Sequence, residues 1–80
     1  MNCVYILKSK NADWHYVGQT NNLEKRLKRH NSGQVPSTKN KRPFEVIHVE
    51  EYETRKEAMD RESYLKSRKG YNNYKNVLKK

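Results

Sequence analysis

A carboxylate lies among apolar residues on the helix expected in the second half of the chain. At about 100° per residue, Glu62 falls about 40° from Ala58 and about 60° from Leu65, within a stripe that also includes Met59. Charged side chains are rarely buried without a partner, so this position suggests metal binding or another function. The alternative is that Glu62 lies at the edge of the stripe and pairs with a lysine. Helical spacing alone does not decide between the two.

Two further side chains able to do chemistry lie on an earlier expected helix. His30 shares the apolar stripe of Leu23 and Leu27, and Arg26 lies on its flank. Packing, or a contact of His30 with the negative end of the helix dipole, is an alternative explanation for both residues. The other basic residues of this helix are expected to face solvent: Lys25, Lys28 and Arg29.

The elements that must position these side chains follow from the patterns along the chain. Two short apolar runs, 4–7 and 14–17, are separated by a polar loop and predict a β-hairpin. A helix is expected to begin at Asn21, three residues before Glu24 in the pattern of a capping box, and to stop at Gly33. An exposed loop is expected next, up to Pro43.

The second half of the chain predicts one strand and two helices. Residues 44–52 are expected to form the longest strand, apolar on both faces as suits a strand covered by helices on both sides. A second capping box, Thr54 with Glu57, opens a helix expected to run to about Lys69. Apolar residues at helical spacing over 74–78 predict a short final helix, so the order is β-β-α-β-α-α.

Size and charge limit the possible functions. The chain has 80 residues, of which 32% are hydrophobic, so we expect a single domain over 1–80 with one modest core. Its 18 Lys and Arg against 9 Asp and Glu give a formal net charge of +9. A folded basic domain favours a polyanionic partner, with nucleic acid ranked before an anionic membrane.

Compartment and redox state are also indicated by composition. No apolar run approaches the roughly 20 residues that span a bilayer, and the first residues lack a signal-peptide pattern, so we expect a cytoplasmic protein without a membrane partner. Cys3 is the single cysteine, which excludes an internal disulfide and a multi-cysteine zinc site. We expect it to pack as a small hydrophobe.

Two tripeptides, Val4-Tyr5-Ile6 and Tyr16-Val17-Gly18, stand nine residues apart on the two strands of the expected hairpin. This pair resembles the signature of the GIY-YIG nuclease superfamily, in particular its small single-domain members. The similarity continues through residues 23–33, which carry Arg26 and His30, and through Arg61 and Glu62. Val4 stands where the signature has glycine, which should affect backbone packing more than chemistry. The implied fold is α+β, a small three-stranded, mainly antiparallel sheet flanked by helices, in agreement with the expected order.

The resemblance implies hydrolysis of a phosphodiester with a single divalent metal, Mg²⁺ or Mn²⁺, held by Glu62. One carboxylate suffices for a hard cation that keeps several waters and binds phosphate oxygens. Arg26 would contact the scissile phosphate through its paired donors. The hydroxyls of Tyr5 and Tyr16 would project into the same site, and Gly18 would let a phosphate or backbone approach closely.

The identity of the general base stays open. An unperturbed tyrosine has a pKa near 10, so its ionisation at pH 7 costs about 4 kcal/mol unless a metal or arginine lowers that pKa. By resemblance, Tyr5 is favoured as the base, with Tyr16 orienting the nucleophile. The alternatives are His30, with an unperturbed pKa of about 6.5, and a hydroxide held by the metal.

The chain is expected to rely on its own loops and tail for substrate binding, because it has no room for a separate DNA-binding domain. Lysines and arginines in these segments would contact phosphates without reading sequence: Lys39, Lys41, Arg42, Lys66, Arg68 and Lys69. We therefore expect an endonuclease of low intrinsic sequence specificity, acting on DNA rather than RNA. The alternative is a nucleic-acid-binding module without turnover. Attachment to anionic lipid ranks below both, since no helix has an aromatic, lipid-facing side.

Overall fold

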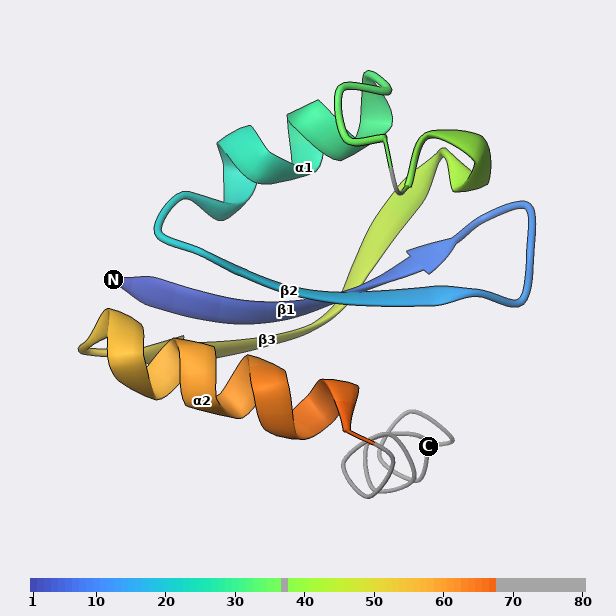
Figure 1. Cartoon of the computed structure of the whole chain (residues 1–80). Coiled ribbons are helices and arrows are strands. Elements are labelled where there is room, and N and C mark those ends of the chain that lie inside the picture. Colours follow the sequence, from blue (N-terminus) through green and yellow to red (C-terminus); the bar gives the residue numbers. More distant parts are fainter. Residues whose placement is uncertain (37, 68–80) are drawn as a thin grey trace.

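The computed structural model describes residues 1–36 and 38–67 of the chain (Figure 1). The expected order β-β-α-β-α is confirmed over these residues, and the expected final helix at 74–78 lies outside them. The elements are β1 (Asn2–Ser9), β2 (His15–Thr20), α1 (Leu23–Asn31), a 3₁₀ turn η1 (Lys39–Lys41), β3 (Phe44–Tyr52) and α2 (Arg55–Lys66). Within the described ranges, none of the helices is long and apolar enough to cross a membrane.

The three strands form one antiparallel sheet in the order β2-β1-β3, so β1 is its centre. All four residues of Val4–Leu7 are buried. The strand β3 has the expected bounds and is the longest of the three, but it lies at the sheet edge, and Val49 is 41% exposed. Both helices nevertheless contact β3, since Phe44 and Val46 pack on the side of α1, and Ile47 and Tyr52 pack on the side of α2. The expected cover of both faces is therefore present, but it is incomplete at Val49.

The two long helices pack on opposite faces of the sheet (Figure 1). Successive side chains of a strand point to opposite faces, so β1 contributes to both layers. Leu23 and Leu27 of α1 pack against a cluster formed by Tyr5, Leu7 and Phe44. On the other face, Ala58 and Leu65 of α2 join the second cluster, with Val4, Ile6 and Val17. Tyr5 therefore lies on the α1 side of the sheet.

The first helix begins one residue later than expected. Asn22 is its N-cap, and the Oδ1 atom of Asn22 accepts a hydrogen bond from the backbone N–H of Lys25 at 3.1 Å. The expected capping box of Asn21 with Glu24 is therefore wrong, although the cap is an asparagine as the pattern required. The expected stop at Gly33 is confirmed, since α1 ends just before it and Gly33 has a φ of +82°.

The second long helix begins as expected and ends earlier. Thr54 and Glu57 form the predicted capping box. The helix ends at Lys66 instead of about Lys69, because Ser67 has an extended backbone with ψ at 160°. Met59 is 45% exposed, so its expected place in the apolar stripe is also wrong. The helix buries only a narrow line of residues through Ala58 and Leu65.

Candidate active site

The two signature tyrosines meet beside Gly18 near the β2 edge of the sheet. Tyr5 on β1 pairs with Gly18 on β2. The ring centres of Tyr5 and Tyr16 lie 6.4 Å apart. A Cβ atom at position 18 would lie 2.5 Å from the Tyr5 Oη atom and 3.0 Å from the Tyr16 Cε2 atom. Glycine is therefore needed here to give the tyrosines room. Close approach of a phosphate to Gly18 stays a prediction.

The Tyr5 hydroxyl is connected to the interior of the α1 layer by a chain of hydrogen bonds. Its Oη atom lies 3.0 Å from the Nε2 atom of His30, which is 1% exposed. On the other side of the imidazole, Nδ1 lies 3.0 Å from the Oγ1 atom of Thr38. Thr38 itself donates to the backbone carbonyl of Val35 at 3.3 Å.

This chain of contacts assigns the proton positions. Because the Thr38 hydroxyl donates its hydrogen to Val35, its oxygen accepts from the Nδ1–H of His30. The Nε2 atom of His30 is then unprotonated and accepts the hydrogen bond of the Tyr5 hydroxyl. His30 is thus a neutral imidazole with an acceptor facing Tyr5, held in that tautomer by Thr38.

The electrostatic surroundings agree with this assignment. Burial lowers the pKa of His30, and the positive charges of Arg26 and Arg29 lower it further, which keeps the imidazole neutral. Burial raises the pKa of Tyr5 above its ordinary value, and Tyr16 and Glu62 add to that rise, while Arg26 opposes it. Free tyrosinate at position 5 is therefore disfavoured in the unliganded protein.

Arg26 comes to the site from α1. It is partly buried, and its charge acts on both Tyr5 and His30. Across residues 1–36 and 38–67, no acidic side chain forms an ion pair with it. Its guanidinium borders a surface hollow, so its donors are available to a ligand.

Glu62 comes to the site from α2, on the other face of the sheet. Its side chain is 22% exposed and forms an ion pair with Lys66 at 3.4 Å, one helical turn away. The pairing with a lysine at the edge of the stripe, left open by the sequence, is therefore present. The charge of Glu62 nevertheless acts on Tyr5, and the Lys66 ammonium lies 5.4 Å from the centre of the Tyr16 ring. That Glu62 forms one site with Arg26 and the two tyrosines stays a prediction.

The residues fit a cation that is held mainly by water and substrate. No group of three or more His, Cys, Asp or Glu side chains able to enclose a metal occurs in the described part of the chain. A site built from all-protein ligands is therefore not formed by these residues, and a soft metal such as zinc is disfavoured. Glu62 offers one half-buried carboxylate whose protein partner is a partly exposed lysine, which suits Mg²⁺ or Mn²⁺ with retained waters.

The remaining predicted binding residues lie elsewhere. Lys39, Lys41 and Arg42 belong to η1 and the residue after it, next to the end of β1, where the Lys41 carbonyl accepts a hydrogen bond from Ser9 at 2.7 Å. The side chains of Lys39 and Arg42 are exposed, and that of Lys41 is partly buried. Their contact with a nucleic acid stays a prediction. Arg68 and Lys69 lie outside the described residues.

Thr38 is the site residue that the sequence does not reveal. It lies in a segment expected to be an exposed loop, yet it is fully buried beneath α1. Eight residues separate it from His30, and no spacing pattern links the two. A small hydroxyl residue in a polar loop gives no signal of its own, so only the folded chain shows the contact.

Comparison with known proteins agrees with this arrangement. Residues 1–75 match the family model described as the GIY-YIG catalytic domain. The chain belongs to the GIY-YIG family. The expected resemblance is confirmed, and with it the α+β fold with an antiparallel three-stranded sheet.

The chain is similar to several proteins named UPF0213. UPF0213 protein CPE1444 of Clostridium perfringens is 46% identical over 67 residues, which is 82% of this chain and 71% of that protein. UPF0213 protein YazA of Bacillus subtilis is 46% identical over 63 residues, covering 78% of this chain and 63% of YazA. The NMR structure of UPF0213 protein BH0048 from Bacillus halodurans superposes with a TM-score of 0.57 at 31% identity, covering 96% of this chain and 85% of that one.

Proposed function

We propose that this GIY-YIG domain hydrolyses phosphodiester bonds in nucleic acid, with DNA as the preferred substrate and Mg²⁺ or Mn²⁺ as cofactor. The observation that carries the proposal is the hydrogen-bonded chain from Tyr5 through His30 to Thr38, next to an arginine and a carboxylate from opposite layers. A tyrosine connected to a neutral histidine can move a proton. Arg26, which has no ion-pair partner among the described residues, can bind an anion. Proton transfer beside an anion-binding group is what phosphodiester hydrolysis requires.

In the proposed reaction, Tyr5 moves a proton without becoming a free tyrosinate. A water molecule, oriented by Tyr16, attacks phosphorus and gives its proton to the Tyr5 oxygen as the Tyr5 hydrogen passes to His30 Nε2. The new P–O bond forms from the water oxygen, and the bond to the leaving sugar oxygen breaks, with that oxygen taking a proton from solvent. His30 then returns its proton through Tyr5 to solvent. Because His30 is 1% exposed and its Nε2 is occupied by Tyr5, His30 acts through Tyr5 and not on the water directly.

Charge on the phosphate is balanced from both layers. Arg26 would hold a non-bridging oxygen of the scissile phosphate with its two parallel donors. Glu62 would hold the divalent cation, which when bound would supply positive charge to the phosphate. The pair of Glu62 with Lys66 would open for this, at a cost of about 1 kcal/mol, because the pair is partly exposed.

The deciding experiment is a cleavage assay on supercoiled plasmid, branched DNA, single-stranded DNA and RNA, with Mg²⁺, Mn²⁺ or EDTA. The wild-type protein should cleave at least one DNA substrate, and EDTA should abolish cleavage. Glu62→Gln and Arg26→Gln should each reduce the rate by at least about a hundredfold. Asp60→Asn and Lys28→Gln are matched controls, since these residues lie on the same helices in exposed pairs of their own.

Purification of every variant by the same route excludes a contaminating nuclease, because a contaminant would be equally active in all preparations. If the wild-type protein binds DNA but no substrate is cleaved with either metal, catalysis is the wrong proposal. The nuclease fold would then serve binding alone.

A further inference from the structure

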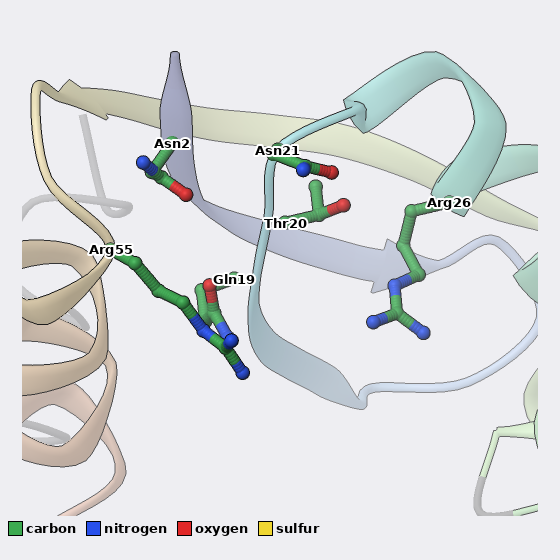
Figure 2. Close-up of a pocket in the computed structure, with 6 residues that line it drawn as sticks. All are labelled: Asn2, Gln19, Thr20, Asn21, Arg26 and Arg55. Atoms are coloured by element: carbon green, nitrogen blue, oxygen red, sulfur yellow. The ribbon is translucent and has the colours of Figure 1, made fainter.

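The hollow that Arg26 borders lies at the end of the sheet where β1 begins and β2 ends, beside the start of α2 (Figure 2). Its volume is about 190 Å³, and it is open to solvent. Its lining is polar throughout: Asn2, Gln19, Thr20, Asn21, Arg26 and Arg55. Figure 2 shows the two arginines on opposite sides of the strand end that carries Gln19, Thr20 and Asn21. Arg26 therefore borders both this hollow and the candidate active site.

The lining favours a ligand that combines negative charge with hydrogen-bonding edges. It holds two guanidinium groups and no carboxylate, and neither Arg26 nor Arg55 takes part in an ion pair formed within the described residues. Three carboxamide side chains supply donors and acceptors together, the combination that contacts base and sugar edges. An aromatic ring on which a base could stack is not among the lining residues.

The size of the hollow limits the ligand to a small unit. Pockets for complete small molecules measure roughly 300–1,000 Å³. A hollow of about 190 Å³ suits one part of a larger ligand, such as a single nucleotide of a chain. A neighbouring hollow of about 200 Å³ shares Thr20, Asn21 and Arg26 and adds three residues, two of them basic: Asn22, Lys25 and Arg29. Arg26 thus stands between two polar, positively charged depressions.

The position of Arg55 is not explained by the stability of its helix. It is the first residue of α2, where the positive end of the helix dipole disfavours a cation. The capping interactions of α2 are made by Thr54 and Glu57 and do not involve the Arg55 side chain. The positive charge of Arg55 at this end of the helix is suited to binding an anion from outside the protein.

We propose that this hollow binds the nucleotide adjoining the scissile phosphate. Arg55 binds the phosphate of that nucleotide, and the carboxamides of Asn2, Gln19 and Asn21 hydrogen-bond its sugar or base edge. This proposal rests on the proposed function, because it places the neighbouring phosphate on Arg26. It makes Arg55 a substrate-positioning residue at the end of the sheet opposite to the η1 lysines.

The first test compares Arg55→Gln with Lys56→Gln in DNA binding. Both variants remove one positive charge from the first turn of α2, but Lys56 pairs with Asp60 and does not line the hollow. With a fluorescent single-stranded DNA of roughly 12 nucleotides in EDTA, Arg55→Gln should weaken binding roughly tenfold and reduce the slope of log K against log salt by about 0.7. Lys56→Gln should weaken binding less than about twofold. An equal loss of DNA affinity in both variants would overturn the proposal, because the overall positive charge of the protein would then explain the binding.

The second test locates the contact directly. In ¹⁵N spectra, titration with the same DNA should shift the Arg55 Nε–H signal and the side-chain amide signals of Asn2 and Gln19, in wild type and in Glu62→Gln. DNA binding that leaves these signals unmoved would overturn the proposal. Both tests are made in EDTA and require no cleavage, so they are independent of the plasmid assay, whose failure would refute hydrolysis alone.

Discussion

Glu50 and Glu62 have nearly the same exposure and opposite surroundings. Their side chains are 20% and 22% exposed. Glu50 accepts hydrogen bonds from Arg61 Nε at 2.8 Å and Nη2 at 3.1 Å, from Tyr52 at 2.7 Å and from His48 at 2.9 Å. Glu62 has Lys66 at 3.4 Å as its ion-pair partner. Burial alone therefore does not distinguish a carboxylate that supports the fold from one that is available to a ligand.

The two arginines show the same contrast. Arg61 makes a two-pronged contact with Glu50, which joins α2 to β3. Arg26 has no such partner in residues 1–36 and 38–67, and it borders both hollows. Glu50 and Arg61 already hydrogen-bond within the protein, and this separates them as a structural pair from the candidate catalytic residues Glu62 and Arg26.

The largest expected effect is that replacing Glu62 reduces activity, whereas replacing Glu50 reduces stability. Glu62→Gln should reduce cleavage at least about a hundredfold with little change in Tm. Glu50→Gln should lower the free energy of unfolding by about 2 kcal/mol, because Arg61 loses its counter-charge, while the activity of the folded molecules is retained. Thermal unfolding and single-turnover cleavage on the same preparations measure both. If each variant loses both properties to the same extent, the contrast between the two glutamates is wrong.

The next effect is a dependence of stability on acid that belongs to Glu50. Burial opposes its ionisation, but hydrogen bonds from Arg61, His48 and Tyr52 outweigh burial and lower its pKa from 4.5 to about 2. A lowered pKa stabilises the fold fully above pH 4.5, and that contribution is lost as the pH falls from about 4.5 to about 2. Urea unfolding over this range should show the loss in wild type and a flatter profile in Glu50→Gln.

Glu51→Gln is the control for this profile, since Glu51 is exposed on the same strand. It should unfold with the acid dependence of wild type. If the pH profile of unfolding is as flat in Glu51→Gln as in Glu50→Gln, the effect comes from overall charge and not from the hydrogen bonds of Glu50.

A smaller effect is expected at Thr38, which acts on the site through His30. Thr38→Val removes the acceptor for Nδ1–H, so the imidazole can rotate or change tautomer, and kcat should fall about tenfold with KM little changed. Thr38→Ser keeps the hydroxyl and should restore most of the rate. Loss of activity in both variants, in proportion to lost stability, would mean that Thr38 serves packing alone.

The pH profile gives this prediction a second measurement. His30 must be neutral to accept the Tyr5 proton, and its lowered pKa keeps it neutral as the pH falls below the ordinary value of 6.5. Wild-type activity should therefore persist at pH values below about 6.5. Thr38→Val should lower the rate without moving the loss of activity to higher pH, because the Nδ1–H of His30 donates to Thr38 in both the neutral tautomer and the protonated ring.

The smallest expected effect is at Lys66. Replacement by methionine removes the partner of Glu62, and because this ion pair is partly exposed, affinity for Mn²⁺ should rise only about twofold. Titration of the protein with Mn²⁺ by electron paramagnetic resonance measures it, with Lys56→Met as the control for loss of one positive charge. A fall in Mn²⁺ affinity would show that Lys66 supports the site and does not compete for Glu62.

Much of the fold could be predicted because its signals are local. The Thr54–Glu57 capping box and the bounds of β3 depend on residues a few positions apart, and both are confirmed. The prediction that Met59 is part of the apolar stripe was wrong, because helical periodicity does not show how much of the helix surface the sheet covers. The central position of β1 could not be predicted from composition, since β1 and β3 are both apolar runs and pairing partners decide which one is enclosed.

By itself, the sequence determined the elements, their order, the family signature and the residue types offered to the site. Only the tertiary structure decided which of those side chains are bound by other residues of the protein and which are available to a ligand. Tyr5 and His30 are 25 positions apart and share a hydrogen bond because α1 packs over β1, and Thr38 completes the chain from a segment with no pattern of its own. Glu50 and Glu62 are both glutamates near apolar residues, and the neighbours that separate their roles are brought together by packing of α2 against the sheet.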